Sequence, residues 1–111
     1  MNTVQLQAIA LREVEPLFTA AEWSDMRSHD VDPATLHLLA FYKALDTGLE
    51  SKTSAVSLLK SVTDLDAAAE RGGKESPGYL FTSVKVRMDA HEMSKHFAAS
   101  EVGAAIQAAL E

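Results

Sequence analysis

The sequence contains no cysteine, which excludes several kinds of chemistry. A chain without thiols forms no disulfide, binds no metal through thiolates and has no cysteine nucleophile. Long apolar runs are also missing, because no stretch approaches the roughly 20 residues that a helix needs to cross a bilayer. The start of the chain does not resemble a signal peptide. We therefore expect a cytoplasmic protein without membrane contact, of a compact size that suits a bacterial or phage protein.

Basic residues are scarce in the first half of the chain. Residues 1–50 hold three basic residues against eight acidic ones, whereas residues 51–111 hold seven against eight, and the whole chain has a net charge of −6. Because a phosphate backbone is negatively charged, the first half would repel DNA or RNA. Nucleic acid is therefore disfavoured as a partner.

What is present indicates one folded domain. The 111 residues are enough for a single hydrophobic core, and 47% of them are hydrophobic, which is typical of globular proteins. We predict an all-α fold, a single domain over residues 1–111 built as a bundle of five or six helices.

Residues 33–47 are predicted to form the central helix of this bundle. Asp32 is a good N-cap, Pro33 suits the first helical position, and Gly48 can take the left-handed conformation that ends a helix. Leucine, alanine and aromatic residues point in nearly every direction around this helix. A helix that is apolar all round is typical of a buried position, so we expect Leu38 and Phe41 in the core.

The other helices are bounded by similar signals. Apolar residues at helical spacing predict a helix over residues 4–14, which Pro16 ends or kinks. Thr19 and Glu22 have the spacing of a capping box and predict a short helix to about Arg27. A long amphipathic helix follows position 51 and ends at Gly72-Gly73, and Ser100 caps an alanine-rich helix to Leu110.

Residues 79–88 are ambiguous. Ser76-Pro77 is a good helix start, which favours a helix, but the segment is rich in β-forming residues. Val84, Val86 and Met88 alternate with Lys85 and Arg87, which is typical of a strand. A short β segment over residues 82–88 therefore stays open as an alternative.

No motif predicts a catalytic, cofactor or metal site, and we expect none. His91 and His96 are five residues apart and diverge by about 140° on a helix, so only Glu92 and His96 share a face. Gly72-Gly73-Lys74 lacks the preceding strand of a phosphate-binding loop. His37 is interpreted as a buried histidine with one hydrogen bond, with a pH-sensitive or ligand-binding role as the alternative.

Residues 84–90, with two short helices and Ser100-Glu101 behind them, resemble the arm of a ribbon-helix-helix repressor or antitoxin. The resemblance implies a two-chain ribbon in the major groove, in which Lys85 and Arg87 read base edges. Eleven residues separate Met88 from Ser100, which is short for the first helix of that family and its turn. A DNA-binding regulator is therefore the alternative function.

The main hypothesis is a small, acidic, non-enzymatic protein-binding module. Its negative charges gather on the first two helices and their turns, at Glu13, Glu15, Glu22, Asp25 and Asp30. Such a surface attracts a basic protein partner or imitates the phosphates of DNA. The module would act as an adaptor, inhibitor or regulator, although the partner itself is not identified.

A third hypothesis is a self-associating structural or assembly protein. The last helix is dominated by alanine, with Ile106 and Leu110 as its large apolar residues. Such a helix packs either on its own domain or on a neighbouring molecule. A homo-oligomer formed through the C-terminal helix follows from the second arrangement.

Overall fold

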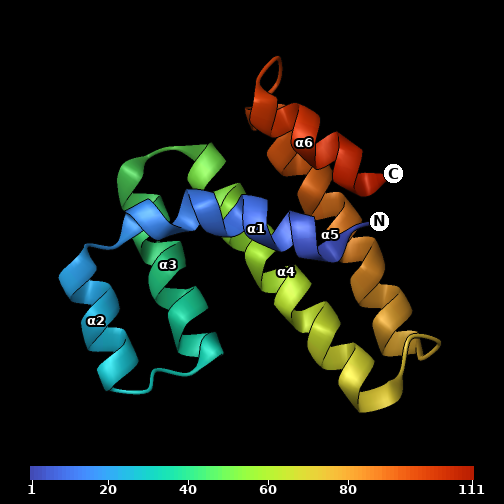
Figure 1. Cartoon of the computed structure of the whole chain (residues 1–111), viewed down its shortest axis with the longest axis horizontal. Coiled ribbons are helices and arrows are strands. Elements are labelled where there is room, and N and C mark those ends of the chain that lie inside the picture. Colours follow the sequence, from blue (N-terminus) through green and yellow to red (C-terminus); the bar gives the residue numbers. More distant parts are fainter.

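The computed structural model describes all 111 residues and consists of helices joined by short turns (Figure 1). In chain order the elements are α1 (Thr3–Val14), the 3-10 turn η1 (Glu15–Leu17), α2 (Ala20–Ser28), α3 (Pro33–Thr47), α4 (Glu50–Gly72), α5 (Pro77–His96) and α6 (Glu101–Leu110). The predicted all-α bundle is confirmed. The molecule measures 40 × 36 × 18 Å, so it is about two helix layers thick.

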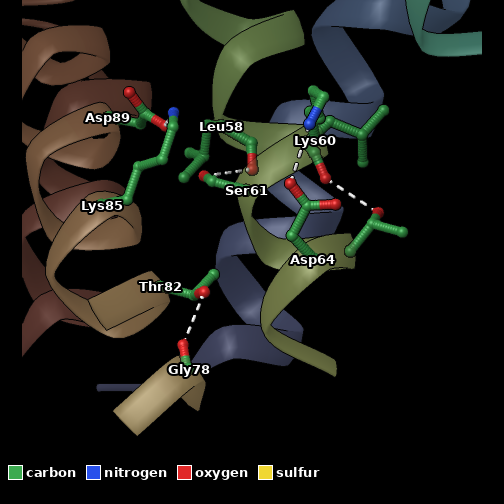
Figure 2. A network of polar contacts seen from close by, with 10 residues as sticks. Leu58, Lys60, Ser61, Asp64, Gly78, Thr82, Lys85 and Asp89 are labelled. Atoms are coloured by element: carbon green, nitrogen blue, oxygen red, sulfur yellow. Dashed lines mark hydrogen bonds and ion pairs between the residues drawn. The ribbon is translucent and has the colours of Figure 1, made fainter. Parts of the chain in front are cut away.

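The longest helix, α4, forms the centre of the molecule and contacts α1, α3 and α5 (Figure 1). Apolar residues recur along it at helical spacing, and Leu58, Val62 and Leu65 are almost completely buried. Its buried Ser61 donates a hydrogen bond to the carbonyl of Leu58, as Figure 2 shows. Because this hydroxyl is satisfied within its own helix, other helices pack against α4 without a polar partner.

The prediction that residues 33–47 form the buried centre is wrong. α3 buries only His37, Ala40 and Ala44, while Leu38 is 54% exposed and Phe41 40% exposed. The two alanines allow α3 to lie against α4 on one side, and no helix covers the opposite side. The predicted ends are confirmed, since Asp32 accepts a hydrogen bond from the amide of Thr35 at 2.7 Å and Gly48 has φ 70°.

The possible strand over residues 82–88 is not formed, because these residues lie within α5. Ser76 caps this helix by accepting a hydrogen bond from the amide of Tyr79. Val86, Ala90 and Met93 are buried at spacings of four and three residues, which is a helical pattern. Packing of this face against α4 therefore outweighs the β-propensity of the segment.

The two ends of the chain lie side by side (Figure 1). The amide of Asn2 donates a hydrogen bond to the carbonyl of Ala109 at 2.6 Å, and α6 packs on both α5 and α1. Ile106 and Leu110 are buried in these contacts. The large apolar residues of α6 are therefore used within the chain's own domain.

The segment formed by α2 and α3 is only partly packed on the rest of the molecule. We call residues 19–49 the α2–α3 arm; α2 has no buried residue. Thr19 and Glu22 form the predicted capping box, with each side chain accepting a hydrogen bond from the other residue's amide. The indole of Trp23 donates to the carbonyl of Glu15, which ties α2 to the turn before it.

Candidate functional site

Large apolar side chains line the outer side of α3. Leu38, Phe41, Tyr42 and Leu45 follow one another at spacings of three, one and three residues, which places them on one side of the helix. Tyr42 is 58% exposed and Leu45 51% exposed. We call these four residues the α3 stripe. An apolar row of this length is usually covered in a folded protein, so its exposure makes the α3 stripe a candidate contact surface.

A groove with a volume of about 330 Å³ lies between α2 and α3 beside this stripe. Its apolar lining comes from Phe18, Met26, Leu39 and Tyr42, and its charged lining from Glu22, Asp25, Lys43 and Asp46. Lys43 forms an ion pair with Glu22 at 2.8 Å. Asp25 and Asp46 form no ion pair, so they give the groove an uncompensated negative charge.

Glu22 connects the two helices of the arm. Its carboxylate accepts a hydrogen bond from the backbone amide of Thr19 and pairs with Lys43 of α3. The Lys43 ammonium, followed by the Thr19 amide, lowers the pKa of Glu22 below its ordinary value of 4.5. Lys43 also lies 5.8 Å from the centre of the Phe18 ring. These contacts link α2 to α3 at the groove.

The structure brings only two of the five predicted acidic residues together. Glu22 and Asp25 share the groove, whereas Glu13 pairs with Lys52 on the side of α1 that faces α4, at 3.7 Å. Glu15 lines a separate hollow with Arg27. Asp30 lies beyond the end of α2 with φ 53°. The acidic surface is therefore divided among four places.

Sequence reasoning missed Asp46 and the α3 stripe. The spacing of Leu38, Tyr42 and Leu45 is visible in the sequence, but it also fits a helix that is covered on every side. The available signal was the contrast between the bulky stripe and the small residues Ala40 and Ala44. Small residues mark the side on which another helix approaches closely.

In α5, Glu92 and His96 share one side of the helix and His91 does not, as their spacing predicts. The Nε2 atom of His96 lies 3.5 Å from Oε1 of Glu92 and 3.9 Å from Oε2 of Glu50. His91 is exposed on another side of the helix. No group of three histidine, cysteine, aspartate or glutamate residues is arranged to hold a metal ion.

His37 faces α4 from the inner side of α3. Burial, and then the nearby Lys60, lower its pKa below the ordinary value of 6.5, while Asp64 acts in the opposite direction. The expected hydrogen bond is absent, and since no buried side-chain nitrogen lacks a partner, the ring nitrogens keep some contact with water. Lys60 and Asp64 pair with each other at 2.8 Å (Figure 2).

The basic residues of the expected DNA-binding ribbon lie on a helix instead. Lys85 pairs with Asp89 one turn further along α5, at 2.8 Å (Figure 2). Arg87 is exposed and forms no ion pair. Without a strand at residues 82–88, a two-chain ribbon that presents both side chains to base edges cannot form.

No helix combines the length and the apolar character that a crossing of the bilayer requires. No protein-family model matches the chain, and no curated protein and no solved structure is significantly similar to it. The assignment of the candidate site therefore depends on the geometry of the α2–α3 arm alone.

Proposed function

We propose that this chain is a non-enzymatic protein-binding module and that the α2–α3 arm is its contact surface. The observation that carries the proposal is the exposed α3 stripe beside the negatively charged groove. Such a module acts as an adaptor, inhibitor or regulator by occupying a partner's surface.

The energetic basis of the proposal is the burial of the α3 stripe. Complete burial of one leucine or phenylalanine side chain contributes about 1.5–3 kcal/mol. Leu38, Phe41, Tyr42 and Leu45 are between 40% and 58% exposed, so covering them contributes on the order of several kcal/mol. Aromatic and aliphatic residues at the centre with charged residues at the edge are the usual composition of a protein interface.

The groove indicates the chemistry of the partner. Asp25 and Asp46 lie next to apolar lining residues and have no basic partner in the chain. They suit a segment that carries both apolar residues and lysine or arginine, such as one face of an amphipathic helix. By contrast, a surface that imitates DNA phosphates gains less support, because lysines already neutralise Glu13 and Glu22.

The titratable groups with shifted pKa values support a non-catalytic function. Asp32 has a lowered pKa because it caps α3, and Glu22 because it pairs with Lys43 and caps α2. His37 has a lowered pKa because it is buried. Each shift has a structural cause, and the three groups do not converge on one pocket.

The proposal is tested by affinity capture: the tagged chain is cross-linked to its partners in the source cells and then purified with them. Replacement of both Tyr42 and Leu45 by Glu should abolish capture, because it places charge in the centre of the stripe. A control that replaces the exposed Val4 and Ala8 of α1 by Glu adds the same charge elsewhere and should retain capture. If both variants capture the same proteins as the wild type, the arm is not the contact surface.

A further inference from the structure

The outer side of α5 carries a second exposed apolar row. Leu80, Phe81, Val84 and Met88 are between 57% and 78% exposed, although they lie on a helix whose other side is well packed. We call these residues the α5 stripe. It spans eight residue steps, about 12 Å, and the α3 stripe spans seven, about 10 Å, so the two rows have similar lengths.

The charges next to the two stripes are of opposite sign. Arg87, His91 and Lys95 follow at intervals of four residues on the same side of α5 as the row of Leu80 and Val84. The acidic residues of α5 are already paired, Asp89 with Lys85 and Glu92 with Lys95. Arg87 has no ion pair. Since the same two pairs neutralise Lys85 and Lys95, Arg87 is the one lysine or arginine of α5 whose charge is uncompensated. This side of α5 is therefore apolar with one uncompensated positive charge, which suits the negatively charged groove of the arm.

One molecule cannot bring its own two stripes together. α4 lies between α3 and α5 and contacts both (Figure 1). Each stripe lies on the opposite side of its helix from the buried residues, so the two stripes face away from each other. A second copy of the chain offers the α5 stripe without this restriction.

We propose that the α5 stripe of one copy docks on the α2–α3 arm of another copy, in a head-to-tail arrangement. The proposal rests on the proposed function, because it names the partner of the same surface. Two different patches meet in such a contact, so each molecule keeps one free face, and association continues into a ring or a chain of molecules. Arg87 lies within the contact, opposite Asp25 and Asp46.

The test measures the mass of the full chain by sedimentation velocity from micromolar to millimolar concentration. One variant blocks the arm by replacement of Leu38 and Leu45 with Glu, and a second blocks α5 by replacement of Phe81 and Val84 with Glu. All four positions are exposed, so circular dichroism should show folded proteins. The Val4 and Ala8 double variant serves as the control.

The wild type and the control should gain mass with concentration, and each blocked variant alone should remain monomeric. A mixture of the two blocked variants should form a 1:1 dimer and nothing larger, because one contributes an intact arm and the other an intact α5 stripe. Raising the salt concentration should weaken association of the wild type by about tenfold, because the charged contacts are screened.

Three results would overturn the proposal. The wild type could stay monomeric at every concentration, or one blocked variant alone could still associate. The mixture of the two blocked variants could also fail to form the dimer although the wild type associates. Binding of the monomeric wild type to anionic phospholipid vesicles through Phe81 would instead assign the α5 stripe to a lipid surface. If self-association fails but capture of another protein still depends on Tyr42 and Leu45, the proposed function stands without this inference.

Discussion

Two glycines in the first turns of neighbouring helices have different surroundings. A Cβ atom on Gly103 of α6 would overlap the backbone carbonyl of Phe97, which cannot move aside as a flexible side chain does. A Cβ atom on Gly78 of α5 would meet nothing within 4 Å. Gly103 is therefore required by the close approach of α6 to the end of α5, whereas Gly78 is not required by packing.

Replacing each glycine by alanine should change stability in opposite directions. Gly103→Ala should lower the free energy of unfolding by about 1–3 kcal/mol through overpacking. Gly78→Ala should raise it by up to about 1 kcal/mol, because alanine is the better helix former. Urea unfolding of the two variants measures both effects. A stable Gly103→Ala protein would mean that α6 sits further from Phe97 than the structure places it.

His37 should make stability depend on pH. Because the folded state lowers its pKa, the unfolded chain binds a proton at higher pH than the folded one. The free energy of unfolding should therefore fall as the pH drops through 6.5, until the folded state is protonated as well. Glu22 and Asp32, whose pKa values are also lowered, contribute stability that is lost only in more acidic solution, below their ordinary values of 4.5 and 3.8.

His37→Gln should reduce this decrease between about pH 7 and about pH 5, because glutamine does not titrate. Lys60 and Asp64 of α4, whose charges act on His37, are common to both proteins. Urea unfolding at a series of pH values provides the measurement. Equal pH dependence in the variant and the wild type would contradict a neutral, buried His37.

Among the helices, α4 occupies the central position that the sequence predicts for residues 33–47. Composition shows that the segment from Leu36 to Leu45 is apolar, but it does not show which other helices surround it. That depends on contacts between residues far apart in the chain, here the packing of α1 and α5 on α4. Local signals were reliable at Asp32, Thr19 and Ser76, where the caps formed as predicted. They were not reliable for the other two long helices, because Asn2 rather than Thr3 caps α1, and α4 begins at Glu50 without a side-chain cap.

The site was predictable only in part for the same reason. Glu22 and Asp25 were identified from the charge pattern, and the structure places them in one groove. Asp46 lies more than twenty residues further along the chain, and only the pairing of α2 with α3 brings it to the same place. The exposed stripes escaped prediction because a helical spacing of apolar residues indicates a packed face equally well.

A leucine-to-alanine substitution in α4 and one in α3 should have different effects on stability. Leu58→Ala in α4 should lower the free energy of unfolding by about 2–5 kcal/mol, because the side chain is completely buried. Leu38→Ala in α3 should cost less than about 1 kcal/mol, because that side chain is half exposed. Chemical denaturation of both variants provides the comparison, and equal losses would place α3 in the core after all.

The molecule as a whole should be least stable in its arm. α2 buries no residue, whereas α4 is covered by α1, α3 and α5. Local opening of α2 therefore exposes little apolar surface. In hydrogen exchange measured by mass spectrometry, amides of α2 should exchange fastest among the helices and those of the middle of α4 slowest. Equal protection would show that the arm and the body unfold as one unit.

The adjacency of Asn2 and Ala109 has a practical consequence for labelling. Both chain ends lie close together beside α5, and α2 lies on the far side of the molecule (Figure 1). A fluorophore or affinity tag at either end is therefore kept away from the arm. Because the two ends are adjacent, a short linker could join them while the chain is opened between Lys74 and Glu75, which would change the order of the helices along the chain without moving them.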